Sequence, residues 1–174
     1  MKKIAELSGM ELRWEQPDAF KMEYILYAGD QEAATLQFRS SFGSFATARS
    51  ADGCWTFKRV GFFQTHVTIR DCETDVDLAE FHNNTWTSGG TLELADGRRY
   101  KASTNFWQTQ FEFCNEQEDV LFQYSKIGGF VHSSAQVVIQ PVALTIPELP
   151  WLVILAWYLS ILMNQDAAAA AAVT

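Results

Sequence analysis

The chain has 174 residues, of which 48% are hydrophobic and 14% aromatic, and its formal net charge at pH 7 is -8. This length fits a single domain with one sizeable core, and the composition is that of a globular rather than a disordered protein. The negative charge argues against nucleic-acid binding and against simple electrostatic adhesion to anionic membranes, because both require Lys and Arg side chains to meet phosphates.

Up to residue 140 the sequence reads as a succession of short strands. Apolar and polar side chains alternate at period two, as in Thr65 to Arg70, and this is typical of antiparallel strands with one face against a core. Turn dipeptides such as Asp52-Gly53 and Asp96-Gly97 separate the runs. We predict about twelve strands, at 10–15, 20–28, 32–39, 44–50, 54–59, 62–70, 75–82, 90–95, 98–103, 107–114, 119–125 and 133–140.

The C-terminal segment breaks this pattern and predicts a helix near 147–163. From Leu149 to Met163 only Ser160 is clearly polar, so the helix is apolar on all sides and must be buried in protein or in lipid. Thr145 and Glu148 fit a capping box at its start, and Pro150 offers a competing start. The Ala-rich tail, 167–174, follows the predicted single domain of residues 1–166.

Length favours burial of this helix in protein over a membrane span. Leu149–Met163 gives roughly 22 Å of helix at ~1.5 Å per residue, whereas a bilayer core needs about 30 Å. Extending the span back to Ala143 buries Glu148, and no Lys or Arg follows Lys126 to set an orientation. A tail-anchored protein that uses Ala143–Met163 as its span remains the alternative, because the aromatic residues of the segment could serve as interfacial anchors.

Twelve strands and one apolar helix suggest a single architecture. A closed barrel of about twelve strands is wider than its own inward side chains can fill, so an apolar helix would complete the core. We therefore predict a mainly β protein, an antiparallel closed barrel that encloses the C-terminal helix. The helix residues expected in this core are Trp151, Leu152, Ile154, Leu155, Trp157, Tyr158, Leu159 and Leu162.

With this strand count and the helix Trp151–Met163, the chain resembles the tubby C-terminal-like superfamily, whose fold is a twelve-stranded barrel around a C-terminal hydrophobic helix. The stretch Leu92–Tyr100 is also similar to the Gly-Arg-x-Tyr hairpins of small bacterial members. The chain lacks a tubby signature sequence and the proline-rich N-terminus of phospholipid scramblases. It is therefore most similar to the small bacterial, LURP-one-related branch.

Tubby domains bind phosphoinositide headgroups through basic residues on the barrel, so the resemblance directs attention to the basic hairpins of this chain. A lipid phosphate or another anion could be held there by charge-assisted hydrogen bonds. In an acidic protein, basic pairs at hairpins are also common as ordinary surface, and that alternative stays open. The candidate residues for binding an anion or a lipid headgroup are Lys58, Arg59, Arg98, Arg99 and Lys101.

Other polar clusters give weaker indications. The acidic run Asp71 to Asp77 has the alternation of a calcium loop, but Val76 and His82 stand where an EF-hand needs Gly and Glu, so a solvated loop is expected. The three histidines, His66, His82 and His132, lack ligand spacing. No motif indicates a catalytic nucleophile, a metal site or a cofactor.

The three cysteines are far apart and odd in number, and they form no CxxC motif. We expect Cys54, Cys72 and Cys114 to be reduced thiols of a cytoplasmic protein, since disulfides are rare in that compartment.

We therefore expect a non-enzymatic, cytoplasmic barrel that binds a phospholipid headgroup or a protein at a membrane surface. Besides the tail-anchored alternative, a carrier of an apolar ligand in the barrel interior is a further one. The apolar helix argues against such a carrier, because it would occupy the cavity.

Overall fold

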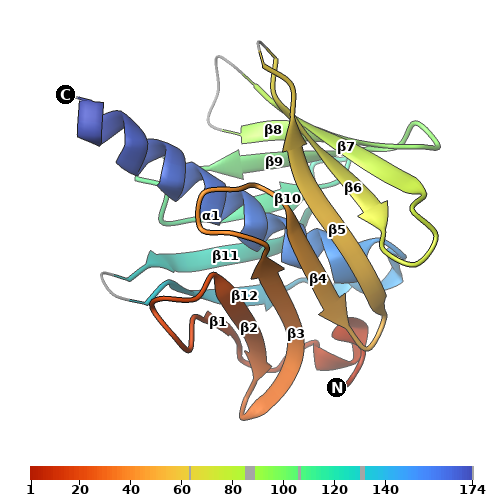
Figure 1. Ribbon diagram of the computed structural model, residues 1–174. Helices are drawn as coiled ribbons and strands as arrows, with labels where there is room; N and C mark the ends of the chain where they lie inside the picture. Colours follow the sequence, from red (N-terminus) through yellow and green to blue (C-terminus); the bar gives the residue numbers. More distant parts are fainter. Residues whose placement is uncertain (63, 85–88, 106, 130–131, 174) are drawn as a thin grey trace.

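The computed structural model describes residues 1–174 except 63, 85–88, 106, 130–131 and 174. It is a closed barrel of twelve antiparallel strands with one helix, α1 (Leu149–Val173), running through it (Figure 1). Strands that follow one another in the sequence are paired, and β1 pairs with β12 to close the ring. The predicted fold class is therefore confirmed, and no strand is left as an open edge.

Every predicted strand has an observed counterpart. The strands are β1 (Leu12–Glu15), β2 (Glu23–Ala28), β3 (Gln31–Phe38), β4 (Ala46–Ser50), β5 (Gly53–Val60), β6 (His66–Asp71), β7 (Asp77–Asn83), β8 (Gly89–Leu94), β9 (Arg99–Thr104), β10 (Phe111–Cys114), β11 (Val120–Gly128) and β12 (Ser134–Ile139). Two short 3-10 helices, η1 (Ile4–Leu7) and η2 (Pro141–Thr145), flank the barrel sequence.

Three strands begin three or four residues later than predicted. β2, β6 and β10 were expected to start at 20, 62 and 107 and start instead at Glu23, His66 and Phe111. Phe20 and Trp107 fit the period-two pattern of the strands that follow them, and Phe62 is out of phase with the buried Val67 and Ile69, yet at all three positions the chain lies outside the sheet. They lie in the connections between strands rather than in the barrel wall.

The two ends of the barrel are distinguished by the helix. We call the end of the barrel where α1 begins the proximal end; the even-numbered strands, β2 to β12, run toward it. We call the end where α1 emerges the distal end; the odd-numbered strands, β1 to β11, run toward it. Figure 1 shows the C-terminal turns of α1 projecting beyond the strands at the distal end. The connections at the two ends therefore form two separate surfaces.

The buried part of α1 fills the barrel, as predicted. Leu149 and every residue from Trp151 to Leu162 are buried, including all the helix residues expected in the core. The strands turn alternate residues inward to meet them, as in the intermediate-buried alternation of β2. The barrel surrounds this part of the helix, so every side of it contacts apolar side chains of the wall. This explains why the segment from Trp151 to Leu162 has no polar face.

Trp157 is the central packing residue. Its ring stacks with Trp14 (centroids 5.8 Å apart) and with Tyr124 (6.3 Å), while Tyr24 meets it edge-on at 5.8 Å. The indole N–H of Trp14 donates to the Tyr124 hydroxyl (2.8 Å), which donates in turn to the carbonyl oxygen of Val153 (2.6 Å). These two hydrogen bonds join β1, β11 and α1, so the helix is held to the barrel wall by hydrogen bonds as well as by packing.

The predicted capping box at the start of α1 is wrong. The helix begins at Leu149, with Pro150 in its first turn, where proline is tolerated. The Thr145 hydroxyl donates to the carbonyl of Val142 within η2, and the Glu148 carboxylate accepts from Arg98 and Tyr100. The Glu148 carboxylate therefore bonds side chains of the β8–β9 hairpin instead of capping the helix. At the other terminus the Ala-rich segment continues the helix as far as Val173.

The expectation of three reduced thiols is also wrong. Cys54 and Cys72 form a disulfide, with their Cα atoms 5.4 Å apart, and Cys114 is free. The β5–β6 register explains the pairing: Trp55 lies opposite Asp71, and the Cys72 amide donates to the Cys54 carbonyl. The wide sequence separation of the two cysteines conceals that the hairpin brings them together.

Candidate functional site

The basic residue Arg98 lies at the proximal end and is part of an ion-pair cluster. Its guanidinium contacts Asp96 (2.9 Å) and the nearly buried carboxylate of Glu148, which also accepts from the Tyr100 hydroxyl (3.2 Å). These partners raise the pKa of Arg98, Glu148 foremost. Burial, helped by the Glu148 charge, raises the pKa of Tyr100 to about 12. The cluster fixes the β8–β9 turn against the start of α1.

The other predicted anion-binding residues do not form one patch with Arg98. Arg99 and Lys101 project from β9 and pair with Glu93 (3.2 Å) and Glu118 (3.4 Å). Lys58 and Arg59 lie near the distal end of β5. Arg59 pairs with Asp166 of α1, eighteen residues beyond Glu148. At ~1.5 Å per helical residue that is roughly 27 Å away, so Lys58 and Arg59 lie far from Arg98, toward the other end of the barrel.

Acidic side chains dominate the connections at the proximal end. The Asp71 carboxylate accepts from the Thr74 hydroxyl and from the amides of Glu73 and Thr74, and these bonds, those of Thr74 foremost, lower its pKa. The acidic run is thus the solvated loop that was expected, and the structure shows no grouping of three metal-ligating side chains among the residues it describes. The acidic residues between strands at this end are Asp30, Asp52, Glu73, Asp75, Asp96, Glu116, Glu118 and Asp119.

Two histidines form a pair on the barrel wall. His66 of β6 and His82 of β7 lie opposite each other with their rings stacked 5.3 Å apart, and His82 lies 3.3 Å from Glu80. His132 instead makes a 2.7 Å hydrogen bond with the carbonyl of Gln16 through Nδ1. His66 and His82 thus make contacts within the barrel wall, and His132 joins the β11–β12 connection to the residue that follows β1.

Exposed aromatic side chains gather at the distal end, in four separate connections. Phe20 follows β1, Phe42 follows β3, Phe62 follows β5 and Trp107 follows β9. Their exposed fractions are 95%, 104%, 89% and 77%. Single exposed apolar residues are common on soluble proteins, but a large aromatic on each of four neighbouring connections is not. Among the described residues, the exposed apolar side chains nearer the proximal end are Met1, Met10, Val76 and Val142, and none of them is aromatic.

The distal end has far fewer acidic residues in its connections than the proximal end. Its described connections contain one carboxylate, Asp18, and the basic residues Lys21 and Arg39. Close by, exposed Lys126 of β11 and Arg59 of β5 are matched by Glu15, Glu23 and Asp166. The charge is thus unevenly distributed: acidic residues are concentrated in the connections of one end, and the end with the aromatic residues is nearly neutral. Composition alone, with a net charge of -8, hides this separation.

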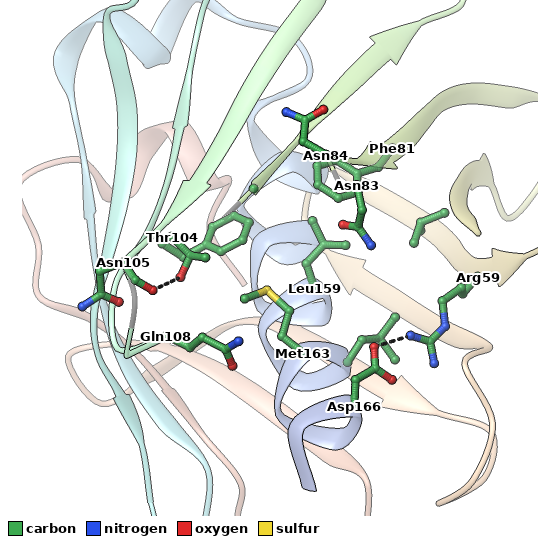
Figure 2. Close-up of a pocket in the computed structure, with 14 residues that line it drawn as sticks. Arg59, Phe81, Asn83, Asn84, Thr104, Asn105, Gln108, Leu159, Met163 and Asp166 are labelled. Carbon is green, nitrogen blue, oxygen red and sulfur yellow. Dashed lines mark hydrogen bonds and ion pairs between the residues drawn. The ribbon is translucent and has the colours of Figure 1, made fainter. Parts of the chain in front are cut away.

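A cavity opens at the distal end beside α1 (Figure 2). Its volume is about 220 Å³. Residues of α1 line this space on one side and residues of β5 to β10 and their connections line it on the other. The apolar part of the described lining is Val67, Phe81, Gly89, Phe111, Leu159, Leu162 and Met163, and the polar part is Arg59, Asn83, Asn84, Thr104, Asn105, Gln108 and Asp166.

Polar side chains surround the mouth of this cavity. The Asn105 side chain is committed to its own loop, where it accepts from the amides of Thr109 and Gln110. In Figure 2 the amide groups of Asn83 and Gln108 point toward the cavity from opposite sides. The charged pair at the mouth, Arg59 and Asp166, is 2.7 Å apart, so its charges offset each other.

By length and composition α1 could cross a membrane, but 61% of its most apolar window lies buried in the barrel. Neither models of known protein families, nor curated proteins, nor solved structures match this chain. The geometry of the two barrel ends is therefore the basis for inferring function.

Proposed function

We propose that this protein is a non-enzymatic, peripheral membrane-binding barrel that meets the bilayer with its distal end. The observation that carries the proposal is the placement of Phe20, Phe42, Phe62 and Trp107, all highly exposed, on four connections of one end. Aromatic rings favour the interfacial region of a bilayer, where an apolar body and a polar surrounding are both available. Hairpin tips are well placed to insert without disturbing the barrel.

The expected binding energy is that of a reversible membrane protein. Complete burial of a large apolar side chain contributes roughly 1.5–3 kcal/mol. Half-burial of four rings in the headgroup region then contributes about 3–6 kcal/mol in total. A single myristoyl chain gives marginal binding of about the same strength, with an association constant on the order of 10⁴ M⁻¹. The protein should therefore exchange between the membrane and solution.

Charge would set the orientation of the bound protein. An anionic surface attracts basic residues within about a Debye length and repels acidic ones. Lys21, Arg39 and Lys126 lie toward the aromatic tips, while the acidic connections lie at the far end of the barrel. The proposal thus keeps the expected membrane-surface role but transfers it from Arg98, Arg99 and Lys101, which face carboxylates, to the opposite end. The tubby-like family assignment stays a prediction.

Vesicle co-sedimentation tests this function. The variant Phe20→Ser/Phe42→Ser/Phe62→Ser/Trp107→Ser should lose at least tenfold in affinity for phosphatidylcholine vesicles containing phosphatidylserine. The matched control, Met10→Ser/Val76→Ser/Val142→Ser, removes exposed apolar side chains at the proximal end and should bind like the unmodified protein. Equal binding by all three proteins, or no binding by any, would overturn the proposal. Protein that resists carbonate extraction would favour the tail-anchored alternative.

A further inference from the structure

We infer that the distal cavity binds the alkyl chain of a single-chain lipid whose head is uncharged, such as a monoacylglycerol. The argument against a carrier was that the helix would occupy the barrel interior, but a cavity of about 220 Å³ remains beside the last buried turn of the helix. This inference rests on the proposed function only for the route by which the lipid arrives, because binding itself requires no membrane.

The lining of the cavity favours an alkyl chain. Val67, Phe81 and Phe111 of the wall are almost fully buried, and they face Leu159 and Leu162 of the helix. Met163 adds an adaptable thioether at the mouth. If each methylene group occupies roughly 30 Å³, the volume of one liquid water molecule, the cavity holds about seven methylene groups. A medium-length chain fits, with its last carbons and its head in the open mouth.

The mouth favours an uncharged head. The amides of Asn83 and Gln108 point toward the cavity, and each offers both donors and an acceptor. They suit hydroxyl and ester groups better than an ion. The charged residues in the described part of the lining, Arg59 and Asp166, already pair with each other at 2.7 Å. A carboxylate or ammonium head would have to compete with that pair.

The backbone of Gln108 supports a role in binding. Its φ is 56°, in the left-handed region that residues other than glycine seldom adopt. The loop holds it there through the Asn105 carbonyl, which accepts from the Gln108 amide at 3.0 Å. Strained positions of this kind often occur at ligand sites. At this position the side-chain amide of Gln108 points toward the cavity.

Methionine NMR gives a direct test in the unmodified protein. The chain has four methionines, of which Met163 lines the cavity and Met10 lies at the opposite end. With ¹³C-labelled methyl groups, glycerol monooctanoate below its micellar concentration should shift the Met163 signal saturably and leave Met10 unchanged. Shifts of both signals in parallel, or no saturable shift of Met163, would overturn the inference.

Head chemistry is tested by calorimetry with three octyl ligands. Glycerol monooctanoate should bind at least tenfold more tightly than octanoate or octylammonium. Tighter binding of octanoate would overturn the uncharged head and indicate that Arg59 leaves Asp166. Equal binding of all three would overturn selection by the amides. Asn83→Ala and Gln108→Ala should each weaken the neutral ligand severalfold and reduce its advantage over octanoate.

A cavity-filling variant tests the location. Met163→Trp should abolish binding of glycerol monooctanoate. Val138→Trp, which also introduces a tryptophan but on the outer face of β12, should not. Near-UV circular dichroism checks that both fold; if Met163→Trp does not, the alanine variants and the NMR shift still decide.

Two further arms separate the sources of the lipid. The variant lacking the four aromatic tips should still bind the free ligand, so loss of vesicle binding and loss of cavity binding are distinguishable. After incubation with vesicles containing a monoacylglycerol and separation from them, native mass spectrometry should show one bound lipid in the unmodified protein. A bound lipid only after incubation with free ligand would assign the source to solution, and its absence in both arms would overturn the inference.

Discussion

Arg59 of β5 and Asp166 of α1 form a 2.7 Å ion pair at the distal mouth of the barrel, although they are 107 residues apart in the sequence. At the proximal end the ion pair of Arg98 and Glu148 joins the β8–β9 turn to the residue just before α1. The helix is thus attached to the wall near both of its ends, with the aromatic packing around Trp157 between them. The distal pair also borders the cavity, so it couples the position of the last helical turns to the shape of the mouth.

The Arg59–Asp166 pair should affect local opening more than global stability. The Asp166 side chain is 58% exposed, and exposed ion pairs contribute roughly 0.2–1 kcal/mol. Asp166→Asn should therefore lower the free energy of unfolding by less than about 1 kcal/mol. Amide hydrogen exchange should nevertheless accelerate across 163–173 and stay unchanged across 151–160. A uniform acceleration along the whole helix would contradict this account.

The two stacked tryptophans should respond differently to truncation. Trp14 and Trp157 are both fully buried, but only Trp14 donates its indole N–H, to Tyr124. The indole nitrogen of Trp157 has no acceptor among the residues that the structure describes. Both changes to Phe remove similar volume, whereas Trp14→Phe also leaves the Tyr124 hydroxyl without its donor. Chemical denaturation should show Trp14→Phe to be the more destabilising, by about 1–3 kcal/mol. Equal losses would contradict the assignment.

The disulfide should contribute measurably to stability. It closes a loop with a sequence separation of 18, for which chain entropy predicts roughly 3 kcal/mol. Cys54→Ser/Cys72→Ser should lose about this much in urea unfolding, and so should the unmodified protein after reduction. Cys114→Ser serves as the control for loss of a half-buried thiol and should keep its sensitivity to reductant. Identical unfolding with and without reductant would contradict this prediction.

Alkaline pH should unfold the protein through its buried tyrosines. Burial raises the pKa of Tyr24 to about 12, and it also raises the pKa of Tyr124 and of Tyr158. A raised pKa means that the folded state retains the proton more tightly than the unfolded state. The resulting stability is complete below pH 10 and is lost as the pH rises through the folded-state pKa, by roughly 1.4 kcal/mol for each unit of difference.

The test is urea unfolding at pH 8, 9, 10 and 11. The free energy of unfolding should be nearly constant from pH 8 to pH 9 and should decline above pH 10. Tyr24→Phe should show a shallower decline. If stability does not fall between pH 10 and pH 11, or falls equally in Tyr24→Phe, the account of these tyrosines is wrong.

The barrel and its helix were predictable because they depend on periodicity. Alternation identified all twelve strands, and the absence of a polar face between Leu149 and Met163 indicated a helix surrounded by protein. The same alternation misplaced Phe20 and Trp107, because an aromatic residue beyond the end of a strand fits the pattern as well as one inside it. Phe62 is out of phase with Val67 and Ile69, and there the predicted strand was extended too far. Only the pairing of the strands shows where the sheet ends and those rings leave the core.

The functional site was less predictable because it depends on which ends of the strands meet. The basic residues attracted attention by their type, but the sequence does not show that Arg99 faces Glu93 or that Lys101 faces Glu118. The separation of charge between the ends was present in the sequence, since acidic residues recur in every second connection. Counting charge by alternate connections would have revealed it once antiparallel pairing was assumed.

The orientation of the barrel on a membrane is the central claim, and a solvent-sensitive fluorophore at each end tests it most directly. In a Cys114→Ser background, a nitrobenzoxadiazole probe is attached at Ser41→Cys beside Phe42, or at Asp30→Cys in the β2–β3 turn. With vesicles containing phosphatidylserine, the probe at position 41 should shift to shorter wavelength and brighten, and the probe at position 30 should keep its spectrum in water. A response at position 30 alone, at both positions, or at neither would contradict the account.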